Sequence, residues 1–196
     1  MQTRPDLTVA LQRLLAAMVE LSPLLHRVDV NAIVVVAVSA HGMAAASVRP
    51  LTAKASAHEG EASAACARSV VIDGCKRSIE LALRPPFFLQ GDAPARLVTL
   101  AHELLHLDGN RLRTENLHTQ KTHAALEKEA RAIATAVLPL LDARAVLCLA
   151  HHGEVTLRAW KHRPIEATHR RAFNDDDVYA QPVMMVTPAD RRGGWW

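Results

Sequence analysis

The chain of 196 residues carries a formal net charge of +3 and a hydrophobic content of 49%, close to that of ordinary folded domains. These values exclude a disordered or fibrous chain, and the mild charge, with no long basic run, predicts no nucleic-acid partner. Three cysteines do not make a disulfide framework, and neither a leader-type segment nor a bilayer-length apolar run is present. We therefore expect a cytoplasmic protein that has no membrane partner.

In chain order, the first half predicts one helix and three strands. Leucines recur at helical spacing over residues 5–25, which predicts an amphipathic helix. The β-branched run over residues 32–38 predicts a buried strand, whereas residues 41–51 show little periodicity. Residues 69–72 predict a second strand that ends in an Asp-Gly turn. Residues 78–83 alternate between apolar and other side chains, which predicts a half-buried third strand.

The second half predicts two long helices. The first begins at Asp92 or Pro94, which suit an N-cap and a first turn, and extends to about Leu107. Gly109 follows it as a residue typical of helix ends. The second helix covers residues 122–138 and ends before a proline.

Beyond these helices the pattern weakens. Residues 145–150 and 155–160 predict two more strands, and the periodicity fades from Lys161 onward. Elements of this kind predict an α+β fold in which a small mixed sheet packs on helices. We expect a single domain over residues 1–165 and a partly ordered tail over residues 166–196.

The first of the two long helices contains His102-Glu103-Leu104-Leu105-His106, which matches the HExxH pattern. Because residues four apart lie on one face of a helix, both imidazoles can bind a single ion. Glu103 lies beside them, where its carboxylate can act as a general base toward a water molecule. The motif therefore predicts Zn²⁺ as cofactor, His102 and His106 as metal ligands and Glu103 as the catalytic residue.

A catalytic zinc ion takes three protein ligands, so a third ligand must follow the motif. The extended metzincin pattern fails, because Leu112 stands where its third histidine would be. His118 lies in a polar connection that could fold back over the metal. His123, Glu127 and Glu129 lie on the next predicted helix and remain further candidates, and Asp108 would need a sharp bend of the chain.

Residues on both sides of the motif follow a wider pattern. Residues 85–89 read PPFFL, residues 96–106 read RLVTLAHELLH, and Asp108, Gly109, Arg111, Arg113 and His118 follow. This pattern resembles a group of uncharacterised bacterial and archaeal metallopeptidase domains, and the resemblance spans residues 30–165. It implies a minimal zincin-like domain with the sheet packed on the active-site helix, and it implies His118 as the third zinc ligand.

A second, weaker resemblance concerns the helix after the motif. Residues 127–130 read EKEA, and Ala134 and a Leu-Pro pair follow. This arrangement is similar to a helix of the ImmA/IrrE family of zinc peptidases, which act on transcriptional repressors. The resemblance implies Glu129 as the third ligand and a regulatory role in a mobile element.

These observations lead to one main expectation and two alternatives. We expect a zinc-dependent peptidase that hydrolyses a peptide or protein substrate. The alternatives are a repressor-directed regulatory protease and a non-catalytic binding module that zinc only stabilises. By analogy with zincins, residues 78–83 are expected to form the edge strand that an extended substrate pairs with. Tyr179, His123 and Arg113 are open candidates for stabilising the oxyanion, and the sequence carries no signal of oligomeric state.

Overall fold

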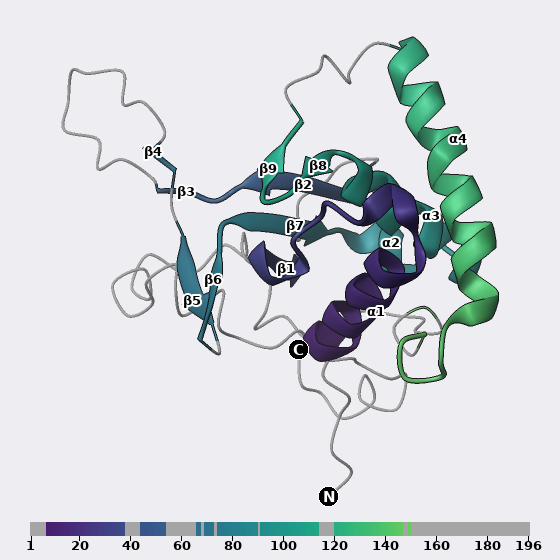
Figure 1. Ribbon diagram of the computed structural model, residues 1–196, viewed down its shortest axis with the longest axis horizontal. Coiled ribbons are helices and arrows are strands. Elements are labelled where there is room, and N and C mark those ends of the chain that lie inside the picture. The colour runs from purple at the N-terminus through teal and green to yellow at the C-terminus, as the bar shows by residue number, and fades with distance from the viewer. Residues whose placement is uncertain are drawn as a thin grey trace, which may run out of the picture.

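The computed structural model describes residues 7–37, 44–53, 66–67, 69–72, 74–89, 91–113, 120–146 and 149 (Figure 1). In this part the chain combines helices with a small mixed sheet, which confirms the predicted α+β class. The predicted tail over residues 166–196 and the predicted strand over residues 155–160 lie outside the described residues. No helix of the described part is long and apolar enough to cross a bilayer.

The α-helices of the described part follow the apolar periodicity of the sequence. They are α1 (Leu7–Leu21), α2 (Pro85–Leu89), α3 (Ala93–Leu105) and α4 (Gln120–Val137). Short 3₁₀ turns lie at Pro23–Leu25, Val30–Ala32 and Leu138–Leu140. The predicted helix over residues 5–25 is therefore α1 followed by a separate turn, and the predicted helix over residues 122–138 is α4.

A sheet of three strands forms the centre of the fold. Its order is β1 (Ile33–Ala37), β7 (Ile79–Leu83), β2 (Ala46–Pro50), with β7 parallel to β1 and antiparallel to β2. The β-branched run in β1 suits a buried strand that pairs with β7 along its full length. β2 was not predicted, because its residues ASVRP alternate too weakly to stand out.

Shorter strand pairs extend from the sheet or follow α3. They are β3 (Thr52–Ala53) with β4 (Cys66–Ala67), β5 (Val70–Ile72) with β6 (Cys75–Arg77), and β8 (Leu107–Asp108) with β9 (Arg111–Leu112). The β5–β6 hairpin confirms the predicted strand and its turn, where Gly74 has a positive φ of 75°. In Figure 1 the β3–β4 and β5–β6 pairs lie on the side of the sheet opposite α4.

The hydrophobic core lies between the sheet, α1, α3 and α4. Each of these helices contributes one apolar stripe, and the sheet contributes the face that carries Ile33, Val35, Ile79 and Leu81. Helix α4 runs along α3 at one side of the molecule (Figure 1). The packing of these two helices positions the face of α3 that carries the histidines.

A buried arginine fixes the first half of α3. Arg96 is 1% exposed, and it donates from Nε to the carbonyl of Phe87 at 2.7 Å and from Nη2 to that of Phe88 at 2.7 Å. It also donates from Nη1 to the carbonyl of Leu149 at 2.8 Å. A guanidinium offers five donors in a fixed plane, so one side chain ties α3 to α2 and to the segment that follows α4.

Three predicted features are wrong in detail. Strand β7 is not a half-buried edge strand: it is the middle strand, and all five of its residues are buried. Its Glu80 is fully buried, and Arg49 of β2 offsets the cost of burying this carboxylate, with Nη2 2.6 Å from Oε1. Gly109 does not end α3; it forms the turn between β8 and β9, at a φ of 64°. The strand predicted over residues 145–150 does not begin there, because residues 145 and 146 belong to a turn over residues 143–146.

Candidate active site

Helix α3 carries the HExxH residues His102 to Leu105, and His106 is its C-cap residue. Its first turn is capped by Asp92, whose Oδ1 accepts a hydrogen bond of 2.8 Å from the backbone N–H of Ala95. Its buried face packs through the apolar residues Leu97, Leu100, Ala101, Leu104 and Leu105. The adjoining face presents His102 and His106 one turn apart, as the spacing of the motif requires.

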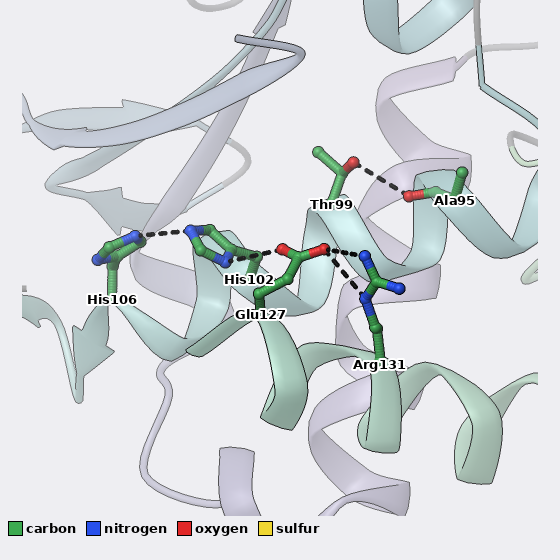
Figure 2. A network of polar contacts seen from close by, with 6 residues as sticks. All are labelled: Ala95, Thr99, His102, His106, Glu127 and Arg131. Atoms are coloured by element: carbon green, nitrogen blue, oxygen red, sulfur yellow. Dashed lines mark hydrogen bonds and ion pairs between the residues drawn. The ribbon is translucent and has the colours of Figure 1, made fainter. Parts of the chain in front are cut away.

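The two histidines face one another through their Nε2 atoms. These atoms are 3.2 Å apart, and the ring centroids are 4.9 Å apart (Figure 2). Two nitrogens that share one zinc ion at about 2.0–2.1 Å in tetrahedral geometry are separated by roughly 3.3 Å. The spacing of the pair is therefore compatible with two ligands of one Zn²⁺ ion, and it also suits a hydrogen bond between the two rings.

Glu103 is the buried carboxylate of the site. Its side chain lies under β2, and its Oε2 accepts a hydrogen bond of 2.9 Å from the backbone N–H of Val48. Burial raises the pKa of Glu103 to about 7, against the lowering effects of the Val48 hydrogen bond and of the Arg84 guanidinium. A carboxylate with a pKa near neutrality can both accept and release a proton under ordinary conditions.

Helix α4 brings a second row of polar side chains to the motif. His123, Glu127 and Arg131 are spaced four residues apart and so lie on one face of α4. The ring centroid of His123 is 4.9 Å from that of His102, and Oε2 of Glu127 is 3.6 Å from Nδ1 of His102. Arg131 donates to Oε1 of Glu127 from Nη2 at 3.0 Å and from Nε at 3.2 Å (Figure 2).

His102 is thus surrounded on three sides. Burial is the largest effect on it and lowers its pKa, as does the neighbouring His123, while the Glu127 carboxylate acts in the opposite direction. Its side chain is 12% exposed. Its Nδ1 atom is buried and, within the described part of the chain, has no hydrogen-bond partner.

The candidate third ligands have different positions. His118 lies outside the described residues, as does Tyr179. Glu129 is exposed on α4, two residues from Glu127 and so on a different face of the helix. Asp108 is directed to the surface, where Arg27 Nε binds its Oδ1 at 3.0 Å. Among the residues that the structure describes, no three His, Cys, Asp or Glu side chains form a group able to hold a metal ion.

A cavity of about 490 Å³ lies beside the motif. Its polar wall contains His102, Glu103 and Thr99 of α3 together with His123, Glu127 and Arg131 of α4. Its remaining lining consists of small apolar side chains from α3 and from the segment that leads into β2: Ala44, Ala45, Ala46, Pro94, Ala95 and Val98. The site therefore combines an open, largely apolar chamber with a general base and an imidazole at its border.

Protein-family models, curated proteins and solved structures were compared with this chain, and none matches it.

Two residues of the candidate site were not predicted. Arg131 lines the cavity and binds Glu127, and its signal in the sequence is the four-residue spacing from Glu127. Val48 donates its backbone N–H to the Glu103 carboxylate. No pattern in the sequence could have identified Val48, because 55 residues separate it from Glu103 and the contact depends on the tertiary fold.

Proposed function

We propose that this chain is a zinc-dependent peptidase with a minimal zincin-like fold, in which His102 and His106 bind the ion and Glu103 acts as the general base. The observation that carries the proposal is the placement of Glu103: it is buried, oriented by a backbone donor, and lines a cavity together with His102. A structural zinc site needs neither a general base nor a chamber for substrate, so these features favour an enzyme over a zinc-stabilised module.

The chain's own groups divide the work of hydrolysis. A Zn²⁺ ion, when bound, supplies Lewis acidity toward a carbonyl group and makes a water molecule easier to deprotonate. The Glu103 carboxylate accepts a proton from this water molecule and can later deliver it to the leaving amine. The hydrogen bond from Val48 to Oε2 holds the carboxylate in place, so that Oε1 remains for this transfer. The apolar part of the cavity wall offers contact to the side chains of a bound peptide.

The beginning of strand β2, and not β7, is the proposed place where substrate lies against the sheet. It lies at the edge of the sheet in the described part of the chain, antiparallel to β7, and contacts α3. Ala46, its first residue, lines the cavity. A peptide bound in the cavity would therefore run past the beginning of β2, an arrangement that supports a zincin-like site.

The proposed activity is tested with metal-loaded protein and an unfolded, alkylated protein as substrate. Glu103→Gln should keep one zinc ion per chain and lose hydrolysis by about a thousandfold or more, because only the base is removed. His102→Ala should lose the zinc. Elemental analysis gives the metal content, and mass spectrometry of new peptide termini gives the activity.

Glu129→Gln is the matched control for Glu103→Gln, since Glu129 is exposed on α4. It should keep both zinc and activity; loss of zinc in this variant would instead support Glu129 as a ligand. His118 stays the predicted third ligand, and His118→Ala should lose zinc. Full activity of Glu103→Gln, or one zinc per chain in His102→Ala, would refute the proposal.

A further inference from the structure

The contacts of Glu127 separate its two carboxylate oxygens. Oε1 accepts both hydrogen bonds from Arg131, at 3.0 and 3.2 Å, and Oε2 is directed at Nδ1 of His102, 3.6 Å away (Figure 2). Arg131 is 70% exposed, whereas the His102 side chain is 12% exposed, so the network runs from the surface into the site. Each oxygen of Glu127 thus has a different partner.

The side of the imidazole that Glu127 approaches decides what Glu127 can do. The two ring nitrogens of a histidine point in different directions, and Nε2 of His102 faces His106. Glu127 lies at the other nitrogen. To bind an ion between the two Nε2 atoms, its carboxylate would have to leave Arg131 and cross the ring. Its observed position suits a carboxylate that accepts a hydrogen bond from Nδ1–H of His102. Histidines that bind metals commonly donate their second ring N–H to such an acceptor.

We propose that Glu127, held by Arg131, is a positioning residue that keeps the proton of His102 on Nδ1 and leaves the Nε2 lone pair for the metal ion. This inference rests on the proposed function, because it assigns His102 to a metal site. The buried Nδ1 supports it: among the described residues no other acceptor reaches this atom, and the 3.6 Å gap needs only a small side-chain shift to become a hydrogen bond. Glu127 therefore orients a metal ligand and is not itself a ligand.

The first test uses the metal-free protein and does not depend on activity. Nitrogen NMR of ¹⁵N-histidine-labelled protein at pH 8, where imidazole is neutral, reports which nitrogen of His102 carries the proton. The wild type should show the proton mainly on Nδ1. Glu127→Ala should shift the population toward Nε2, and Arg131→Ala should shift it less and in the same direction. Glu129→Ala, on the same helix but exposed, is the matched control and should resemble the wild type.

The second test measures Co²⁺ binding by its visible absorption, followed by competition with Zn²⁺. Glu127→Ala should bind one ion with an unchanged band but about 10–100-fold more weakly, which is the effect expected for a group that orients a ligand. Glu127→Gln, whose amide oxygen can still accept from Nδ1, should lose less affinity than Glu127→Ala. A changed band with near-complete loss of binding would identify Glu127 as a ligand and overturn the inference.

The two proposals can fail separately. If the wild type binds neither Co²⁺ nor Zn²⁺, the proposed function is wrong, and the proton position of His102 still decides the role of Glu127. If Glu127→Ala matches Glu129→Ala in both the proton position and the metal affinity, Glu127 has no positioning role. In that case the proposed peptidase activity is unaffected, since Glu103 and the two histidines carry it.

Discussion

Glu103 combines burial with a single oriented backbone donor, and this combination has a measurable effect on stability. The side chain is 9% exposed, so water can do little to solvate its negative charge. The unfolded chain has no such restriction, and there the carboxyl group ionises near its ordinary pKa of 4.5. Folding of the metal-free protein is therefore opposed by the charge of this one residue at neutral and alkaline pH.

We expect Glu103→Gln to be more stable than the wild type at pH 8 and equal to it near pH 4.5, in metal-free protein. Because the folded pKa is about 7, the folded chain holds the proton more tightly than the unfolded chain, so stability falls as pH rises from about 4.5 to 7 and levels off at higher pH. The difference in the free energy of unfolding should reach about 3 kcal/mol. Urea unfolding in the presence of a chelator, at half-unit pH steps, measures it.

Glu129→Gln provides the comparison for this pH series. Its carboxylate is exposed, so the variant should follow the wild type at every pH. If the free energies of unfolding of the wild type and Glu103→Gln instead differ by the same amount at every pH from 4.5 to 8, then the folded protein does not disfavour the ionised form of Glu103.

At the scale of the element, the start of α3 depends on one side chain. Asp92 accepts from the N–H of Ala95 in the first turn, where the helix lacks backbone partners. We expect Asp92→Ala to lower the free energy of unfolding by about 1 kcal/mol and the midpoint of thermal unfolding by about 2–4 °C. Circular dichroism during heating measures the change.

Asp92→Asn separates the hydrogen bond from the charge in this prediction. Asparagine keeps an oxygen that can accept from Ala95, so most of the stability should remain. If the asparagine variant loses as much as the alanine variant, the hydrogen bond is not the stabilising interaction.

The sequence predicted the elements whose signals are local. Helix α3 carries an N-cap, an apolar stripe and the HExxH spacing within 15 residues, and α4 and β1 have equally direct patterns. Strand β2 has no such pattern, since its partner β7 and its contact with Glu103 come from distant parts of the chain. Which glutamate of α4 meets His102 was also beyond the sequence, because it depends on how α4 turns against α3. Strand β7 was expected at the edge of the sheet by analogy with zincins, and its central position depends on pairing with the distant strands β1 and β2.

At the scale of the whole molecule, the cavity joins α3, α4 and the segment before β2 into one chamber. We expect Ala95→Trp to fill part of it and to lower kcat/KM for an unfolded protein substrate by on the order of tenfold or more, while the zinc content stays at that of the wild type. Ala95 lines the cavity and is exposed, so the large ring meets no core residue. Initial rates and elemental analysis measure the two quantities.

Ala132→Trp is the matched control, because Ala132 is exposed on α4 and does not line the cavity. It should leave both the rate and the zinc content unchanged. Equal rates for Ala95→Trp and the wild type would mean that substrate does not pass through this chamber.

The backbone of β2 has a further consequence for how the protein meets other chains. The backbone N–H of Leu51 donates to the carbonyl of Ser78, and that of Arg84 donates to the carbonyl of Ala45. The backbone N–H and C=O groups of the odd-numbered residues in this segment therefore point toward β7, and those of the even-numbered residues point outward. Of the outward N–H groups, that of Val48 is given to Glu103, and Pro50 has none. Ala46 alone remains, next to the cavity. A neighbouring molecule cannot join this edge as a continuous ribbon, so the cleft can stay open to solvent without serving as a template for aggregation.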